Sequence, residues 1–475
     1  MKRALAVLAA AVLSVPLLTG FAAAQGAVPP PNPALGPGGT ATMHGDSESS
    51  DTTPHAGPGT GPVAPRYTFL GAACPTVLDG SDGLPQLLCT AILDRSPTVH
   101  LLDPATGGSL AQLTLTKGGL LGGVYAYLDN RDRMVVVDGA GDMLRIGHDR
   151  NGPGGAWRLY ISQRIPIQQA VSGHCGGNNC DSVTSLMPDY AGRVWFATAA
   201  GAVGVVDPVT ESATSMVLPG ERVDNSISSA PDGVAVATNQ ALYLFKVGAN
   251  GGPEVRWRQS YDRGPARKPG QLSWGTGATP TFFGPATGSE HLTITDNAVP
   301  REHLLVYRTA TAQLVCSVPV VDGTENSPIG AGRSVFVAST YGYPYPALPE
   351  GAGPSQPADA PFVGGMTRVD VNPSGTGCDP VWTNTVRSAA VPRLALPEGR
   401  IYTVARRAFW GDPNATSLLD NYDYTVVEAT TGAVQASRPI GASALFDTLQ
   451  TAGMTTPQAA LFQGTLTGIV RVTRP

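Results

Sequence analysis

Lysine is almost missing from this sequence, since it occurs only as Lys2, Lys117, Lys246 and Lys268. The formal net charge is −5 at pH 7, so the composition predicts no basic surface that would bind nucleic acid or anionic lipid. Beyond Gln25 there is no apolar run of the roughly 20 residues that a membrane-spanning helix needs. We therefore expect no nucleic-acid partner and no membrane insertion, and a monomeric protein.

The first residues have the pattern of a secretory signal. The basic residues Lys2 and Arg3 precede an apolar stretch, and small residues stand at Ala22 and Ala24. This order predicts a signal peptide over residues 1–24, with cleavage after Ala24 and secretion of the mature chain. The scarcity of lysine beside abundant arginine and alanine is typical of GC-rich bacterial genomes.

Proline, glycine, serine, threonine and aspartate dominate residues 25–65, as in PPPNPALGPGG and GDSESSD. Such a segment has too little apolar surface to offset the entropy of ordering, so it is predicted to be a disordered leader. His44 and His55 lie within it and are expected to be solvated.

Six cysteines in an exported chain indicate disulfides before metal ligands. Sequence proximity favours three pairs: Cys74 with Cys89, Cys175 with Cys180, and Cys316 with Cys378. A zinc site is the alternative, but the spacings lack the paired C-x₂-C form.

From Arg66 onward the apolar runs are short, β-branched and bounded by turn residues, which indicates an all-β fold. One hairpin pattern recurs in VHLLDPATGGSL, VGVVDPVTESAT and YTVVEATTGAVQA. In each copy an acidic residue and a small turn follow an apolar strand, and a second strand comes next. Aspartate at such a corner bonds its own backbone, and glycine accepts the positive φ of the turn.

A short apolar strand precedes most copies of this hairpin, for example RVWFAT, GVAVAT, SVFVAS and RIYTVA, and we take it as the inner strand of each unit. Units of roughly 50 residues with four strands each predict a β-propeller of seven or eight blades over residues 66–475. A β-sandwich is the alternative. The segment RYTFLG near the N-terminus is expected to complete the last blade with the C-terminal strands, which closes the ring. Cys316 and Cys378 then fall on the outer hairpins of neighbouring blades.

The hairpins LLDPATGGSL, VVDPVTESA and VVEATTGAVQA resemble the repeats of the quinoprotein-like (PQQ-like) propeller superfamily. The resemblance implies a propeller and, in catalytic members, a pyrroloquinoline quinone with a calcium ion held by Glu and Asn. This sequence has no adjacent cysteine pair, and its six tryptophans follow no blade register, so we expect no bound quinone.

The segment NSISSAPDGVAVAT is similar to the loop-and-strand repeat of calcium-dependent lactonase-type propellers. That resemblance implies a calcium ion at the channel mouth, held by Glu, Asn and Asp. Here Ser226 replaces the glycine of the family's pattern.

Two loops of the chain share an acid followed by asparagine, nine residues before a strand valine: Asp224-Asn225 before Val234, and Glu325-Asn326 before Val335. Loops that lead into inner strands converge on one mouth of the channel, and carboxylate and amide oxygens suit Ca²⁺. A third pair, Asp296-Asn297, follows the strand HLTIT. These six residues form a candidate calcium site. The alternative is that they are ordinary turn residues.

The sequence contains no complete set of nucleophile, base and acid, so it does not settle whether the protein is an enzyme. We predict a ligand- or partner-binding module whose channel face takes a small molecule, a polymer or a protein. A calcium-dependent lactonase or esterase and a quinone-dependent dehydrogenase are the alternatives. The tract YGYPYP (341–346) supplies tyrosines that can stack on sugars or peptides, or simply pack over the propeller face.

Overall fold

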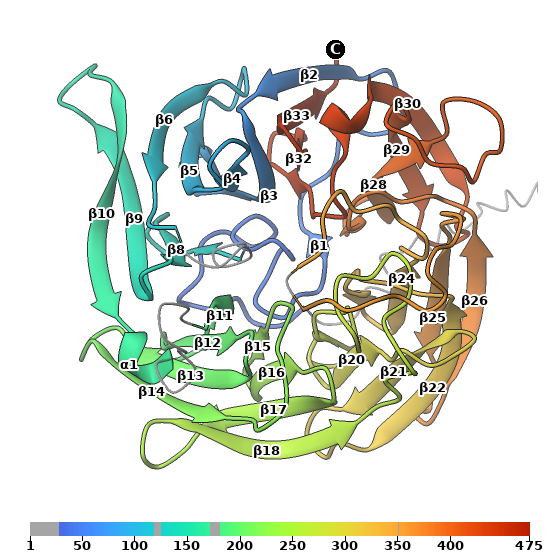
Figure 1. Cartoon of the computed structure of the whole chain (residues 1–475), viewed down its shortest axis with the longest axis horizontal. Coiled ribbons are helices and arrows are strands. Elements are labelled where there is room, and N and C mark those ends of the chain that lie inside the picture. Colours follow the sequence, from blue (N-terminus) through green and yellow to red (C-terminus); the bar gives the residue numbers. More distant parts are fainter. Residues whose placement is uncertain (1–27, 118–124, 172–180, 350) are drawn as a thin grey trace, which may run out of the picture.

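The computed structural model describes residues 28–117, 125–171, 181–349 and 351–475, and it shows eight β-sheets around a central channel (Figure 1). Each sheet contains a blade of four antiparallel strands, and one sheet gains a fifth, parallel strand, so the propeller has eight blades rather than seven. Helix in these residues is limited to α1 (Gln168–Val171) and the short 3₁₀ turn η3 (Ala444–Phe446). No helix of the described residues is long and apolar enough to cross a membrane.

The strands of each blade follow one another from the channel outward. The first blade consists of β3 (Ala72–Asp79), β4 (Pro85–Ala91), β5 (Pro97–Leu102) and β6 (Ser109–Thr114), and the second of β7 (Tyr127–Leu128), β8 (Met134–Val137), β9 (Asp142–Arg150) and β10 (Trp157–Pro166). The third blade consists of β11 (Val183–Pro188), β12 (Val194–Thr198), β13 (Ala202–Asp207) and β14 (Ser212–Val217), and the fourth of β15 (Ser228–Ala230), β16 (Gly233–Ala237), β17 (Ala241–Val247) and β18 (Pro253–Ser260). The fifth blade consists of β19 (Thr281–Phe283), β20 (His291–Thr295), β21 (Glu302–Arg308) and β22 (Leu314–Val321), and the sixth of β23 (Ile329–Ala331), β24 (Ser334–Ala338), β25 (Met366–Val371) and β26 (Cys378–Asn384). The seventh blade consists of β27 (Arg393–Ala395), β28 (Arg400–Arg407), β29 (Asn421–Glu428) and β30 (Val434–Ala442), and the eighth of β31 (Met454–Thr455), β32 (Leu461–Gly464), β33 (Gly468–Thr473) and β2 (Ala64–Phe69).

The apolar core lies between neighbouring blades, where middle strands such as β12 and β17 bury both faces. Trp195 of β12 packs against Phe245 of β17 with ring centroids 6.2 Å apart. Outer strands such as β18 alternate between exposed and half-buried residues, because only one face meets the next blade. The predicted hairpin corners are confirmed: Asp103 Oδ1 accepts hydrogen bonds from the backbone N–H groups of Ala105 at 2.8 Å and Thr106 at 2.9 Å.

Ring closure by the two ends of the chain is also confirmed. Strand β2 pairs antiparallel with β33 and so completes the eighth blade, with Tyr67 opposite Val470. The Cys316–Cys378 disulfide joins outer strands β22 and β26 of neighbouring blades, and Cys74–Cys89 joins β3 to β4 within one blade. The third predicted pair, Cys175 with Cys180, and the predicted signal peptide lie outside the described residues.

The strands predicted to be innermost are in fact second from the channel. SVFVAS forms β24, and the innermost strand of that blade is β23, a three-residue segment that the sequence interpretation had assigned to a polar loop. Strands β15, β19 and β27 are equally short. Three residues cannot show an alternating pattern, and the crowded axis favours small residues such as those of SSA and IGA. The three-residue innermost strands of these four blades therefore carry no alternating hydrophobic signal of their own.

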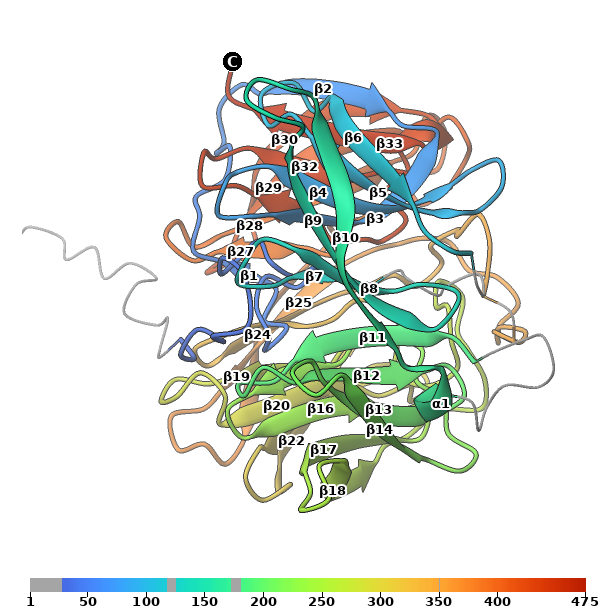
Figure 2. The same ribbon diagram turned by 90° about the vertical axis from the view of Figure 1, so that its left-hand side faces the viewer.

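Residues 28–53 cover one end of the ring, and residues 39–53 of this stretch are almost entirely buried; we call residues 28–53 the N-terminal plug (Figure 1, blue). Figure 2 shows that the plug occupies one end of the channel, whereas the long orange connection between β24 and β25 lies at the other end. We call these the plug end and the loop end. The short strand β1 (Thr52–Thr53) pairs parallel with β27, beside Leu394 and Ala395.

Equivalent positions of four successive blades bind the plug. The middle residue of each three-residue innermost strand donates its backbone N–H to a plug carbonyl: Ser229 to Ser47 at 2.6 Å, Phe282 to Glu48 at 3.0 Å, Gly330 to Ser50 at 2.9 Å, and Leu394 to Asp51 at 3.0 Å. The innermost strand of a blade has an edge with no neighbouring strand, and its polar groups need partners. The plug supplies acceptors to these edges in sequence order.

The prediction of a disordered leader is therefore wrong for residues 28–53. The segment is as poor in apolar residues as the sequence indicated, and it builds no core of its own. It is ordered by the ring, because the free strand edges accept its backbone and because its polar side chains are buried against partners. His44, expected in solvent, is 5% exposed.

Candidate functional site

Four connections gather at the loop end because of the blade topology. In an antiparallel blade, the connection into the innermost strand and the connection between the second and third strands share one end of the channel. Residues 218–227, 261–280 and 322–328 are connections of the first kind, and residues 339–365 are of the second kind. The predicted convergence of the Asp224-Asn225 and Glu325-Asn326 loops rests on this geometry.

The loop at 322–328 runs along the channel wall from the loop end to the plug. Three consecutive residues of it have different partners: Glu325 faces neighbouring loops, Asn326 binds Gln450, and Ser327 binds the plug residues His44 and Asp51. This stretch is therefore the side-chain link between the two ends of the channel.

Glu325 is the centre of the site at the loop end. Its Oε2 accepts a hydrogen bond from Leu272 N at 2.9 Å, and its side chain also bonds that of Asn225. Burial raises the pKa of Glu325 to about 8, and the nearby charge of Asp224 adds to the rise. The carboxyl is thus mostly protonated at neutral pH and can donate a hydrogen bond. A Cβ at Gly277 would lie 2.5 Å from Glu325 Oε2, so the glycine permits this position.

Asp224 lies beside this group and pairs with Arg222, whose Nη2 is 3.2 Å from Oδ1. Burial raises its pKa above the ordinary value, and the arginine opposes the rise. Asp224 and Glu325 are surrounded by protein, yet both keep part of their surface exposed. A side chain can be enclosed by protein and still be partly exposed where it lines an internal space that solvent reaches.

Two polar atoms near Glu325 are buried without a hydrogen-bond partner among the described residues: Asn326 Oδ1 and the Tyr345 hydroxyl. Asn326 is 1% exposed, and its Nδ2 donates to Gln450 Oε1 at 3.1 Å. Tyr345 comes from the tract YGYPYP, and its ring lies edge-on to Tyr343 with centroids 5.0 Å apart. Burial raises the pKa of Tyr345, and the charge of Glu325 contributes.

A cavity of about 640 Å³ opens at the loop end, lined by Tyr345 but not by Glu325 or Asn326, and we call it the loop-end cavity. Its wall is formed by Arg267 and Gly270, by Tyr343 and Tyr345, and by residues 412–416 of the connection between β28 and β29. Gly342 N donates to Pro269 O at 3.0 Å, which holds the tyrosine tract against the neighbouring loop. The tyrosines of YGYPYP therefore both pack over the propeller face and line a cavity.

The plug forms the floor of the channel beneath Glu325. Met43 of the plug packs with Tyr125, Val391 and Ala452. Burial raises the pKa of Tyr125, and the charges of Glu325 and Asp51 both add to the effect. Tyr125 thus lies between the plug and the Glu325 group.

His44, Asp51 and Ser327 have the residue types of a hydrolytic triad but not its geometry. Nδ1 of His44 is 3.0 Å from Asp51 Oδ1 and 3.1 Å from Ser327 Oγ, and Ser327 also donates to Asp51. A triad uses one ring nitrogen for the acid and the other for the nucleophile. Here Nε2 is 3.4 Å from Thr279 Oγ1. The cluster locks the plug to the ring and has no nucleophile poised for attack.

Asp296 and Asn297 are not part of the Glu325 group. Asp296 accepts hydrogen bonds from the backbone and side chain of His303, and Asn297 Nδ2 donates to Arg263 O and Ala266 O. Both residues are buried and serve local loop structure. Among the described residues no group of three or more His, Cys, Asp or Glu could hold a metal ion. Calcium binding by the other four predicted residues stays a prediction.

Sequence reasoning found Glu325, Asn326 and Asn225 through the repeated loop pattern, and it noted the tyrosine tract. It missed the plug residues that form the floor, because their composition is that of a solvated tail. It also missed Gln450, which no repeat marks.

No family model matches the sequence, and no curated protein matches it. Among solved structures, the chain is similar to the β-propeller domain of Cps50 (Swd1) from Myceliophteria thermophila, with 11% identity over 86% of this chain and 99% of that one and a TM-score of 0.42. It is also similar to BamB from Moraxella catarrhalis, with 13% identity, coverage of 72% and 93%, and a TM-score of 0.38. A functionally unknown protein from Desulfotomaculum acetoxidans is also similar, with 13% identity over 80% of this chain and 96% of that one and a TM-score of 0.40. At this level of identity the likeness carries no information about activity.

Proposed function

We propose that this protein is an exported binding module that takes a small, uncharged, hydroxyl-rich molecule into the loop-end cavity. The observation that supports the proposal is the unpartnered hydroxyl of Tyr345, a residue that lines the loop-end cavity. Most buried polar atoms in proteins have a partner, because leaving one unpaired costs about 1–3 kcal/mol. A ligand hydroxyl group would supply this partner.

The charges around the cavity favour a neutral ligand. Asp224 is paired with Arg222, and the charge of Arg267 lies within reach of Glu325. The hydroxyl of Tyr345, a cavity-lining residue, can both donate and accept a hydrogen bond with such a ligand. The cavity is lined by one basic and two acidic side chains, Arg267, Asp359 and Asp412, so charges of both signs lie in its wall and favour neither an anion nor a cation over a neutral molecule.

Export is proposed from the N-terminal pattern of residues 1–24 together with the disulfides Cys74–Cys89 and Cys316–Cys378, since disulfides persist mainly outside the cytosol.

A thermal-shift screen tests the binding proposal. Wild type is melted with a panel of monosaccharides and polyols (glucose, galactose, N-acetylglucosamine and myo-inositol) at millimolar concentrations. A ligand at 100 times its Kd should stabilise the folded state by about 2.7 kcal/mol. Tyr345→Phe should abolish the shift while leaving the free protein at least as stable, because it removes an unpaired hydroxyl.

Tyr341→Phe is the matched control, since Tyr341 belongs to the same tract but does not line the cavity. Its ligand response should equal that of wild type. A panel that stabilises no sample, or a ligand shift that survives in Tyr345→Phe, would contradict the proposal.

Calcium is a second candidate ligand, because Glu325, Asn225 and Asp224 do come together. If it binds there, millimolar Ca²⁺ should raise the Tm of wild type relative to EDTA, and Glu325→Gln should lose most of that rise. Turnover of lactones or aryl esters that depends on Ca²⁺ would then support the hydrolase. Equal melting in Ca²⁺ and EDTA would exclude this site. The quinone-dependent dehydrogenase gains no support from the described residues and stays a prediction of the resemblance.

A further inference from the structure

The connection between β28 and β29, residues 408–420, exposes large apolar side chains. Trp410 is 74% exposed, Leu418 75% and Leu419 51%, and Phe409 packs beside Trp410 with ring centroids 5.0 Å apart. Isolated exposed apolar residues are common on protein surfaces, but several on one short loop mark an interaction site.

This loop is held rigidly from beneath. Asp420, 1% exposed, accepts hydrogen bonds from Arg406 Nε at 2.7 Å and from Ser417 N and Oγ at 3.0 and 2.7 Å. The Arg387 guanidinium donates to the carbonyls of Pro413 and Ala415. These bonds fix the loop between Pro413 and Asp420, so little backbone entropy of this part would be lost when a ligand binds.

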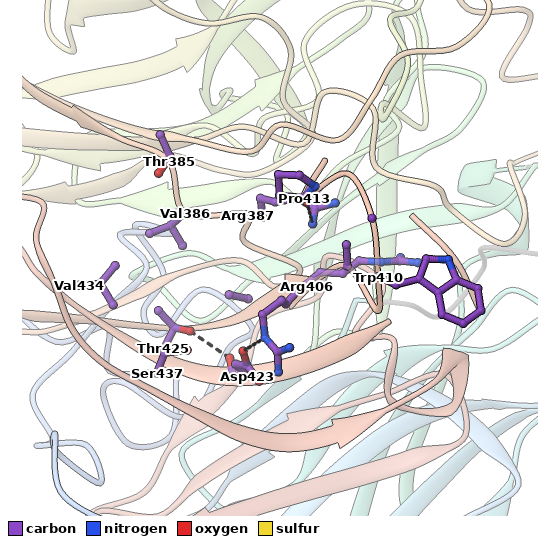
Figure 3. Close-up of a pocket in the computed structure, with 14 residues that line it drawn as sticks. Thr385, Val386, Arg387, Arg406, Trp410, Pro413, Asp423, Thr425, Val434 and Ser437 are labelled. Carbon is purple, nitrogen blue, oxygen red and sulfur yellow. Dashed lines mark hydrogen bonds and ion pairs between the residues drawn. The ribbon is translucent and has the colours of Figure 1, made fainter. Parts of the chain in front are cut away.

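A groove of about 420 Å³ lies beside Trp410 on the rim of the seventh blade (Figure 3). Figure 3 shows Trp410 on one side of the groove and Asp423 with Thr425 on another. Arg407 forms a two-pronged pair with Asp423, with Nε 2.9 Å from Oδ2 and Nη2 3.4 Å from Oδ1. The Arg407 side chain remains 57% exposed, so its guanidinium can also donate to a ligand.

We propose that this groove binds a pyranose unit of an uncharged polysaccharide. A pyranose ring has an apolar C–H face and an edge of hydroxyl groups. Trp410 offers a flat apolar surface to the face, and the Arg407–Asp423 pair offers planar donors and acceptors to neighbouring hydroxyls. Asp423, the acidic residue of the groove, is neutralised by Arg407, and Arg406 is neutralised by Asp420 and Asp447, which favours a neutral polymer over a basic one.

The inference goes beyond the loop-end cavity and does not depend on it. Trp410, Gly411 and Pro413 line the groove, whereas Asp412, Asn414 and Thr416 of the same loop line the cavity. The loop is thus the wall between two separate spaces, and each has its own diagnostic variant.

Affinity gel electrophoresis tests the inference with four soluble neutral polysaccharides: hydroxyethylcellulose, xylan, barley β-glucan and galactomannan. At least one should retard wild type. Trp410→Ala should weaken that binding by about tenfold or more, and Trp410→Tyr should recover part of it, because a ring is restored. Arg407→Gln should weaken binding less. Trp410 is exposed, so the Tm of each Trp410 variant should match that of wild type.

Leu418→Ala is the matched control, since Leu418 is equally exposed on the same loop but does not line the groove. It should bind as wild type does, and so should Tyr345→Phe, whatever the fate of the loop-end cavity. The inference is overturned if no polysaccharide retards wild type, or if Trp410→Ala binds normally. Equal losses in Leu418→Ala and Trp410→Ala would also overturn it, in favour of an apolar protein-docking surface.

Discussion

Glu48 makes the docking of the plug depend on pH. It is 3% exposed; the Tyr190 hydroxyl donates to its Oε1, and Ser47 Oγ donates to Oε2 at 3.0 Å. Burial raises the pKa of Glu48 to about 8, and the neighbouring Asp46 adds to the rise. The folded state therefore holds a proton that the unfolded chain releases near its ordinary pKa of 4.5.

Because the folded state binds this proton more tightly, stability from Glu48 is fully present below about pH 4.5. It is lost as the pH rises to about 8, and it changes no further above that. At about 1.4 kcal/mol per pKa unit, the loss is on the order of 5 kcal/mol. Glu48→Gln keeps the shape of the side chain and has no proton to lose. It should therefore be far more stable than wild type at pH 9, but not at pH 5.

The assay is urea unfolding of both proteins at pH 5, 7 and 9, with the exposed Glu211→Gln as a control for the loss of a carboxylate. Buried carboxyls remote from Glu48 titrate equally in wild type and in Glu48→Gln, so the difference between the two proteins reports on Glu48 together with the interacting Asp46. The gap in unfolding free energy should widen with pH by several kcal/mol for Glu48→Gln and by almost nothing for Glu211→Gln. A gap that stays constant from pH 5 to 9 would refute a buried, protonated Glu48 and hence the docked plug.

Three further predictions concern the parts that fix the channel. Arg393→Met should lower the free energy of unfolding, measured in urea, by about 3–5 kcal/mol. Arg393 is 3% exposed, donates to the carbonyls of Gly39 and Met43, and lies near the acids Asp46 and Asp51. A loss below about 1 kcal/mol would contradict its place beneath the plug. Replacing Cys316 and Cys378 by serine opens a 62-residue loop and should lower the free energy of unfolding by about 4 kcal/mol. Replacing Cys74 and Cys89 by serine opens a 15-residue loop and should lower it by about 3 kcal/mol. The reverse order of these two losses would count against an entropic origin of the stabilisation. Gly277→Ala should lower stability by about 1–3 kcal/mol, because its Cβ would meet Glu325; an unchanged Tm would place Glu325 elsewhere.

The propeller could be predicted from the sequence because its hairpins carry local signals. Asp103 and Asp207 form the predicted corners, and the alternation of outer strands such as β18 is that of a half-buried sheet. The three-residue innermost strands could not be found, since segments such as SSA and IGA are too short to show a period and too small for a hydrophobic signal.

The candidate site was predicted in part for the same reason. Asn225 and Asn326 recur at one distance from a strand, and the structure brings Asn225 to Glu325. Asp296 and Asn297 looked alike in sequence but serve their own turn, because acid–amide pairs also satisfy local backbone groups. The plug could not be predicted, since its order comes from strand edges that exist only in the closed ring.

The most direct test of the account is a crystal structure of the protein soaked with the strongest ligand of the monosaccharide and polyol panel. We predict ligand density in the loop-end cavity, with a hydroxyl within hydrogen-bond distance of the Tyr345 hydroxyl, and the plug still in place. Density only at sites away from this cavity, or a ligand that enters the channel from a vacated plug end, would contradict the account.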